Sequence, residues 1–372
     1  MCRKTVISLV AILTASALIV GCGNGADSTG AGTERYQTVA YDVRVFIDQS
    51  PSSDAEANAA KAQRDVEKAF RSLDPFKGCV SEGKERSRGF NLIVQGITGY
   101  TARAHRETIW SFDTTDDVCE RYRNARESQQ SDARRLQLKQ TLSLWPKVRD
   151  FFFSDEKSSP DVENCVKSIM KEVPQSDIMQ DQKTDIVGAL CKSFAAAREA
   201  TSSLSNSFPT LTTSQCMQFQ DRSENPLCSD VVGALRIAAE QAGDVEQSKL
   251  ARECREDDDC KDLQIKQCVY LISDGLHAQG STNPDNWAAL ISNHKADEED
   301  AGATRGERYG NLFDSDNFTE VVLATDGLKG VGEPEFVENV SRFWEGFSSR
   351  VGIDRFETGD INRCLNDYLP KK

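Results

Sequence analysis

Two short runs of the sequence carry side chains that could hold a divalent cation. The first is Asp48-x-Ser50-x-Ser52 and the second is Asp274, and each follows an apolar run typical of a buried strand. Carboxylate and hydroxyl oxygens are the hard ligands that Mg²⁺ and Ca²⁺ prefer. Mg²⁺ keeps several waters when it binds protein, so such a site leaves a position that a carboxylate of a partner could fill.

The elements that must position these residues alternate between strands and helices. This alternation is typical of an α/β fold with a doubly wound, mostly parallel sheet that is covered on both faces. In such sheets, ligands bind outside the carboxyl ends of the strands, where the strand order reverses. The apolar patterns predict strands at 41–47, 90–94, 108–112, 268–273 and 321–324, and helices at 54–73, 229–242 and along the run from Phe336 to Phe347.

A helical block interrupts this alternation between residues 117 and 225. Its charge-laced periodicity predicts helices near 117–150, 161–173 and 183–204, separated by breaks rich in Ser, Thr and Pro. We interpret the block as a disulfide-rich helical insertion or packed subdomain on the surface of the α/β domain.

Three motifs occur in the order that one known family shows. They are the strand that leads into Asp48-Gln-Ser50-Pro-Ser52, the hydroxyl–Asp–(Ile/Val)-Val-Gly-Ala-Leu helix start, and Val-Tyr-Leu-Ile-Ser-Asp274-Gly. Together they resemble the von Willebrand factor type A domain and its metal-ion-dependent adhesion site. The resemblance covers roughly 36–116 and 226–350 and leaves the helical block outside it. It implies a Rossmann-like fold, a bound divalent cation (Mg²⁺ first, with Mn²⁺ or Ca²⁺ possible) and a protein partner that presents an acidic residue.

Carried over residue by residue, the resemblance implies specific ligands. Asp48, Ser50 and Ser52 match the first metal-binding loop, and Asp274 matches the acidic residue after the fourth strand. The third element is a threonine at the start of a helix, and two positions compete for it: Ser229 by chain order and Thr184 by residue type. Both read as hydroxyl N-caps, and Ser229 is favoured because its helix leads directly into strand 268–273.

The N-terminus reads as an export signal followed by an anchor. Residues 1–21 combine the basic Arg3 and Lys4 with an apolar stretch too short to span a membrane. The segment ends Ile-Val-Gly-Cys22, which resembles the bacterial lipobox and implies lipidation of Cys22. Residues 22–35 are a Gly/Ser/Thr-rich tether, so 36–372 is expected to be a domain of the bacterial cell envelope, lipid-anchored, facing outside the cytoplasm and touching the membrane only through the lipid.

Cysteine usage agrees with an exported chain. Ten of the twelve cysteines remain after Cys2 leaves with the signal and Cys22 takes the lipid. An even number in an oxidising compartment predicts up to five disulfides, whose connectivity the sequence leaves open. No Cys-x-x-Cys pair occurs, so neither a zinc ribbon nor a thioredoxin-like site is supported.

Composition narrows the function class. The formal net charge is −14, which disfavours a nucleic-acid partner because neutralising phosphates requires a cationic face. A mean hydropathy of −0.52 excludes a polytopic membrane protein. Phosphate-binding, zinc-protease and serine-hydrolase motifs are missing from the sequence.

These observations favour a non-enzymatic binding module over two alternatives. One alternative is a scaffold lipoprotein that binds through the helical insertion and whose metal site is vestigial. The other is an enzyme in which Asp48 accepts a phosphoryl group. The second alternative is weaker because aspartyl-phosphate chemistry usually places an acid two residues on, where this chain has Ser50.

Overall fold

The computed structural model describes most of the chain after the predicted tether. The predicted signal peptide, the tether with Cys22, and Ser52 lie outside the described residues. The described residues are 36–51, 53–72, 76, 85–98, 101, 104–113, 117–128, 131–154, 161–173, 175, 179–212, 214–215, 229–246, 260–276, 278–279, 285–287, 291, 298–313, 318–327 and 334–365.

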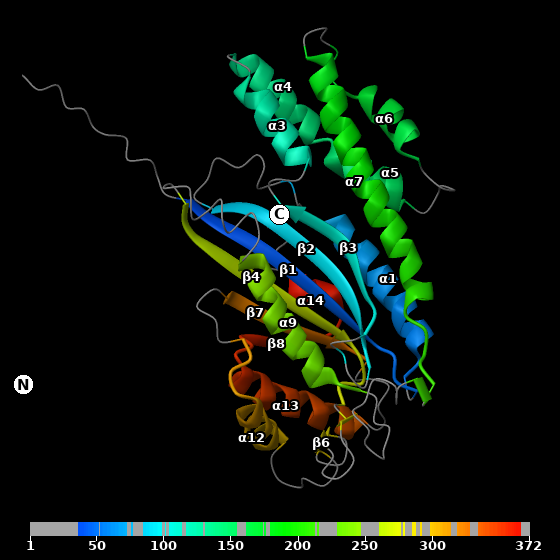
Figure 1. Ribbon diagram of the computed structural model, residues 1–372, viewed down its shortest axis with the longest axis vertical. Helices are drawn as coiled ribbons and strands as arrows, with labels where there is room; N and C mark the ends of the chain where they lie inside the picture. Colours follow the sequence, from blue (N-terminus) through cyan, green and yellow to red (C-terminus); the bar gives the residue numbers. More distant parts are fainter. Residues whose placement is uncertain are drawn as a thin grey trace, which may run out of the picture. The chain divides into compact units, whose positions relative to one another are not determined.

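One mostly parallel sheet organises the described part of the chain (Figure 1). Its six strands lie in the order β3-β2-β1-β4-β7-β8, and only the edge pair β2–β3 is antiparallel. The strand order therefore reverses at β1, which lies between β2 and β4. The strands are β1 (Tyr36–Asp48), β2 (Glu85–Ile97), β3 (Arg106–Asp113), β4 (Cys260–Ile272), β7 (Phe318–Asp326) and β8 (Arg355–Thr358), beside a small pair β5 (Ala278–Gln279) and β6 (Asp285–Asn286).

Helices cover both faces of the sheet, as the doubly wound arrangement requires. In Figure 1 the helices α3 to α7 lie beyond the β3 edge, with α12 and α13 beyond the β8 edge. The described helices are α1 (Ala55–Ser72), α3 (Asp117–Glu127), α4 (Asp132–Leu142), α5 (Trp145–Phe153), α6 (Val162–Met170), α7 (Gln180–Ser207), α9 (Val231–Glu246), α12 (Glu298–Tyr309), α13 (Pro334–Val351) and α14 (Ile361–Leu365).

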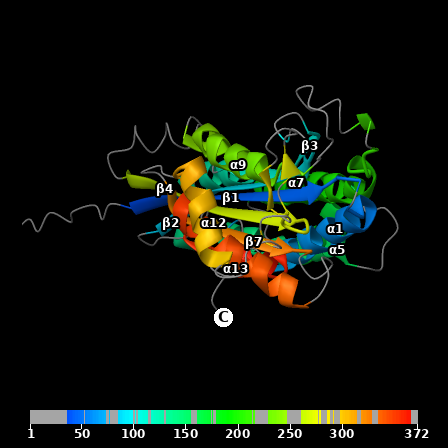
Figure 2. The same cartoon turned by 90° about the horizontal axis from the view of Figure 1, so that it is seen from below.

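The central strands are buried on both faces, and their side chains divide between two apolar cores. Val45 and Ile47 of β1 point into a core shared with α1, whereas Phe46 points into a core shared with α9 and α13. Figure 2 shows α1 and α9 on opposite sides of β1. This two-sided burial explains why β1 and β4 are mostly apolar toward their carboxyl ends. Two polar exceptions in β1, Asp42 and Arg44, are buried and pair with each other at 2.7 Å.

The helical block between residues 117 and 225 shares the α1-side core with the sheet. Phe153 of α5 stacks on Phe70 of α1 with 5.1 Å between ring centroids, and Arg198 of α7 pairs with Glu67 of α1 at 2.5 Å. Residues Arg35–Lys372 accordingly form one compact unit. The predicted α/β class and mostly parallel sheet are confirmed by this architecture.

Several element boundaries differ from the sequence prediction. The single helix expected over 117–150 is three helices, broken before Asp132 and again at Ser143–Leu144, where Pro146 opens the next helix. Strand β4 begins at Cys260, eight residues earlier than its apolar run, because its polar first half pairs with β1. None of the described helices has both the length and the apolar composition needed to cross a bilayer.

Two disulfides join described cysteines. Cys165–Cys191 links α6 to α7 within the insertion, and Cys268–Cys364 links β4 in the sheet to α14 near the end of the described chain. The second bond closes the longer loop, with a sequence separation of 96 residues against 26.

Loss of the longer-range disulfide is expected to be the more destabilising. Under the chain-entropy description, the Cys268→Ala/Cys364→Ala variant loses about 5 kcal/mol of unfolding free energy, and Cys165→Ala/Cys191→Ala loses roughly 1 kcal/mol less. Urea unfolding of both variants, followed by circular dichroism, measures this. A larger loss in the Cys165/Cys191 variant would contradict it.

Candidate metal centre

The carboxylate of Asp48 is the centre of the polar cluster at the carboxyl edge of the sheet. Its residue is only 1 % exposed, at the end of β1 where the strand order reverses. Oδ1 accepts the Ser50 N–H at 2.8 Å, and Oδ2 accepts the hydroxyls of Ser229 at 3.1 Å and Ser273 at 3.0 Å. The Ser50 hydroxyl also hydrogen-bonds to this carboxylate. Three chain segments far apart in sequence therefore converge on one side chain.

The loop after Asp48 is closed by its own hydroxyls. The Ser53 N–H and hydroxyl both donate to the Ser50 carbonyl, at 3.0 and 2.9 Å, and the same hydroxyl lies 2.8 Å from the Asp48 carbonyl. Asp54 then caps α1, because its Oδ1 accepts the Ala57 N–H at 3.1 Å. Since Asp54 performs the capping, the carboxylate of Asp48 remains available to the cluster.

Ser229 reaches Asp48 because a neighbouring residue caps its helix. The hydroxyl pattern predicted Ser229 itself as the N-cap of α9, but Asp230 takes that role: its Oδ1 accepts the Gly233 N–H at 2.9 Å. The main chain of Asp230 is held in turn by the β2–β3 connection, where it donates to the Thr98 carbonyl and accepts the Thr101 hydroxyl, both at 2.9 Å.

The structure does not bring Thr184 to this edge of the sheet. Thr184 lies inside α7 rather than at its start, is exposed, and donates its hydroxyl to the Gln180 carbonyl at 2.9 Å. The end of α7 near Phe208 is the part next to the site, and Thr184 lies about 36 Å along the helix from it at 1.5 Å per residue. Of the two alternatives for the third position, only Ser229 contacts Asp48.

The second carboxylate, Asp274, follows β4 immediately and interacts with the first. Burial and the nearby charge of Asp48 raise the pKa of Asp274 to about 6, although the Leu276 N–H donates to its Oδ1 at 3.0 Å. Burial also raises the pKa of Asp48, against the hydrogen bonds from its serine partners. A buried carboxylate whose proton affinity is raised by the charge of a second carboxylate would also be stabilised by a cation nearby.

The exit turn of β7 supports the turn that carries Asp274. The Ser273 N–H donates to the Asp326 carbonyl at 3.2 Å. Gly327 follows with a φ of +127°, and a β-carbon there would lie 2.5 Å from the Ser273 carbonyl oxygen. Glycine is therefore required at 327, both for its backbone conformation and for this close approach.

The segment that follows α7 in the helical block contacts the loop after Asp48 directly. Gln49, between Asp48 and Ser50, accepts the Leu211 N–H on its carbonyl at 3.0 Å and donates its side-chain amide to the Pro209 carbonyl at 2.9 Å. Its own N–H donates to the Ile97 carbonyl at 3.1 Å. The segment that leaves α7 thus fixes the base of the loop.

The chemistry of this cluster fits a hard divalent cation. A serine hydroxyl that donates its proton to Asp48 keeps its oxygen lone pairs for a ligand, so the buried carboxylate orients neutral oxygen donors beside a second carboxylate. Among the residues that the structure describes, no three His, Cys, Asp or Glu side chains gather into a metal-binding group. A cation here would therefore rely on Asp48, Asp274, serine hydroxyls and water.

Sequence reasoning missed three residues that shape the site. Ser273 belonged to a recognised motif but was not assigned a role, although its position directly before Asp274 was a usable signal. Asp230 could have been recognised as a cap from its spacing to Gly233. Gln49 carried no signal, since its role depends on a segment more than 150 residues away.

Comparisons with known proteins identify no family or relative of this chain. No protein-family model, no curated protein and no solved structure matches the chain.

The raised pKa of Asp274 predicts a pH-dependent effect of neutralising it. The folded state binds the Asp274 proton more tightly than the unfolded state does. The stability that this bound proton gives the folded state is therefore fully present below about pH 4 and is lost as the pH rises through about 6. The Asp274→Asn variant, without added metal and with a chelator, should exceed wild type by up to about 3 kcal/mol in unfolding free energy at pH 7.5. The difference should shrink toward pH 4.

Urea unfolding at both pH values measures this difference. An equal change in unfolding free energy at pH 7.5 and near pH 4 would contradict the assigned electrostatic cause.

Proposed function

We propose that the protein is an extracytoplasmic, lipid-anchored binding module of the von Willebrand factor A type. It holds a divalent cation, most naturally Mg²⁺, at the carboxyl edge of its sheet. Asp48, Ser50, Ser52, Ser229 and Asp274 supply or orient the oxygen ligands, and Ser273 joins them on the basis of its contact with Asp48. The cation supplies a positive centre that an acidic side chain of a protein partner can approach.

One observation carries the proposal. A carboxylate that is 1 % exposed accepts hydrogen bonds from the hydroxyls of Ser229 and Ser273, and within the described part of the chain no lysine or arginine is among its hydrogen-bond partners. Burying a charge in this way is costly unless it is compensated. A bound cation would provide that compensation and would also use the oriented hydroxyl oxygens.

The topology supports the same interpretation. The strand order reverses at β1, and the crevice outside β1 and β4 is where open α/β sheets bind ligands. Asp48 and Asp274 follow these two strands. The antiparallel edge strand β3 and the helices on both faces are compatible with a von Willebrand factor A-like domain whose chain is interrupted by a helical insertion.

Phosphoryl transfer to Asp48 is the weaker alternative, because aspartyl-phosphate chemistry usually places an acid two residues after the nucleophile and this chain has Ser50 there. The insertion, through Pro209 and Leu211, supports the loop at Gln49, so we assign it the role of shaping the site's rim.

Cation titration of four proteins tests the proposal. Isothermal titration with Mg²⁺, Mn²⁺ and Ca²⁺ should give saturable binding to wild type, with no binding to Asp48→Ala. Ser229→Ala should bind about 10- to 100-fold more weakly, since it loses a hydroxyl that faces the site. Thr184→Ala is the matched control, because it removes the competing hydroxyl at the far end of α7.

Two results would reject the metal-dependent mechanism. One is the absence of heat and of any thermal shift for wild type at millimolar cation. The other is equal binding by wild type and Ser229→Ala, with circular dichroism confirming that each variant is folded.

Cation affinity should also fall in mild acid. A cation that binds beside Asp274 must displace the proton that this carboxyl holds below about pH 6. Titrations with Mn²⁺ at pH 7.5 and pH 5 should therefore show roughly tenfold weaker binding at pH 5. The same affinity at both pH values would place Asp274 outside the ligand set.

A further inference from the structure

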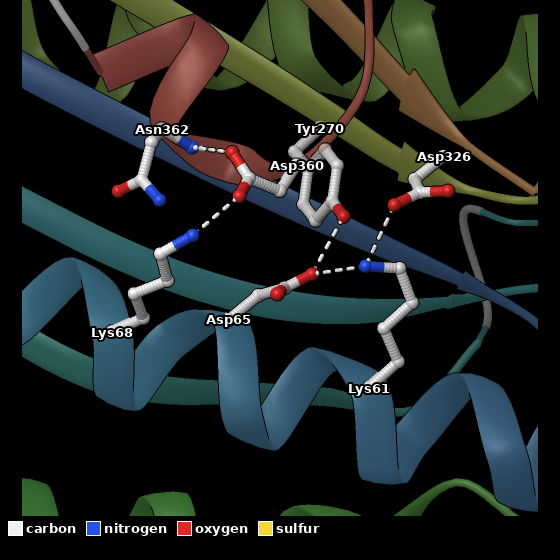
Figure 3. A network of polar contacts seen from close by, with 7 residues as sticks. All are labelled: Lys61, Asp65, Lys68, Tyr270, Asp326, Asp360 and Asn362. Atoms are coloured by element: carbon white, nitrogen blue, oxygen red, sulfur yellow. Dashed lines mark hydrogen bonds and ion pairs between the residues drawn. The ribbon is translucent and has the colours of Figure 1, made fainter.

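A lysine on α1 connects the two segments that carry the aspartates of the candidate site, the Asp48 loop and the Ser273–Asp274 turn. Lys61 Nζ lies 2.7 Å from Asp65 Oδ2 on its own helix and 2.7 Å from Asp326 Oδ2 at the end of β7. Figure 3 shows the Lys61 ammonium between these two carboxylates, with the Tyr270 hydroxyl of β4 directed at Asp65. We call Lys61, Asp65 and Asp326 the Lys61 bridge.

The Lys61 bridge is held firmly on both sides. Tyr270 donates its hydroxyl to Asp65 Oδ2 at 2.7 Å, and Asp65 is only 8 % exposed. Burial alone would lower the pKa of Lys61, but the hydrogen bonds to Asp326 and Asp65 outweigh this effect and raise the pKa above its usual value. Lys61 therefore stays charged at any pH at which the protein would function.

The two ends of the bridge belong to the segments that carry the site. Lys61 is two turns into the helix that begins at the Asp54 cap, directly after the Asp48–Ser53 loop. Asp326 accepts the Ser273 N–H on its carbonyl, and Gly327 packs against the Ser273 backbone. Lys61 is thus connected to the Asp48 loop through the first turns of α1, and Asp326 is connected to Ser273 and Asp274 through its hydrogen bond with Ser273.

We infer that Lys61 is a positioning residue that sets the spacing between the Asp48 loop and the Ser273–Asp274 turn. This inference rests on the proposed function for its effect on cation affinity, although the spacing itself can be measured without a cation. Lys61 acts through Asp326 and belongs to neither carboxylate-bearing loop.

A pure charge effect and a positioning effect predict different Mn²⁺ affinities for Lys61→Met and for the double variant. If Lys61 acted only through its charge, Lys61→Met would bind Mn²⁺ more tightly, Asp326→Asn would bind it more weakly, and the double variant would resemble wild type. If the bridge sets the spacing, both single variants bind Mn²⁺ roughly fivefold more weakly, and the double variant is no weaker than either. Lys61→Arg, which keeps a positively charged side chain at this position, should have a Mn²⁺ affinity within about twofold of wild type.

The same helix offers a matched control. Lys68 pairs with Asp360 at 2.6 Å, just before α14, and Asp360 also accepts the Asn362 N–H (Figure 3). Lys68→Met therefore removes the ion pair with Asp360 and one positive charge from α1, while the pair between Lys61 and Asp326 keeps both its partners. Its Mn²⁺ affinity should equal that of wild type.

A metal-free measurement separates this inference from the proposed function. Hydrogen exchange followed by mass spectrometry, with a chelator present, should show roughly fivefold faster exchange in Lys61→Met at the Ser50 and Ser273 amides, which bond to Asp48 and Asp326. Lys68→Met should leave both amides unchanged.

Each outcome has one meaning. If wild type binds no cation, the proposed function fails, and the positioning role is then judged on exchange alone. If exchange at both amides matches wild type in Lys61→Met, or if Lys61→Met and Asp326→Asn shift Mn²⁺ affinity in opposite directions, Lys61 is not a positioning residue.

Discussion

The burial of the Asp48 carboxylate is the constraint on which the site's architecture depends. Removing such a group from water costs on the order of several kcal/mol, so the fold must bring it partners. The partners come from the loop after β1, the residue before α9 and the end of β4. Meeting this requirement fixes where α9 begins and how the exits of β1 and β4 are aligned, and the meeting point lies where the strand order reverses at β1.

The surrounding structure distributes its capping and supporting roles so that the site residues are left available. Asp54 and Asp230 satisfy the helix N-termini that Asp48 and Ser229 would otherwise serve. Asp326 supports the Ser273 turn by its main chain while its side chain pairs with Lys61. Aspartates and serines that lie close together in the sequence therefore have different roles: some cap a helix or support a turn, and others face the candidate site.

The sequence predicted the fold more completely than it predicted the site. Runs rich in apolar and β-branched residues located strands such as β1 and β7, because strands buried on both faces carry mostly apolar side chains. Helix α12 gave no such signal: Gly302 and Gly306 weaken its periodicity, yet they are needed where the helix approaches α13 so closely that a β-carbon at Gly302 would meet the Phe343 carbonyl. Its existence depends on tertiary packing, which local patterns do not encode.

Within the site, the limits of prediction follow sequence distance. Asp48, Ser50 and Asp274 could be selected because each directly follows a strand. The choice between Ser229 and Thr184 could not be made from residue type, since both precede similar patterns. Chain order favoured Ser229, and in the structure Ser229 contacts Asp48 whereas Thr184 bonds to Gln180 within α7. The cap at Asp230 is a local feature of the sequence, but Ser229 directly before it carries a hydroxyl and was predicted to be the cap instead.

The contacts of Gln49 have a consequence for how the chain can be divided. Excising the helical block would remove Pro209 and Leu211, leaving a main-chain carbonyl and a side-chain amide of Gln49 without these partners in the loop after Asp48. It would also uncover Phe70, whose ring stacks on Phe153. The α/β core and the helical block therefore fold as one unit, and a version of the chain without the block would need a different residue at position 49 and a more polar outer face on α1.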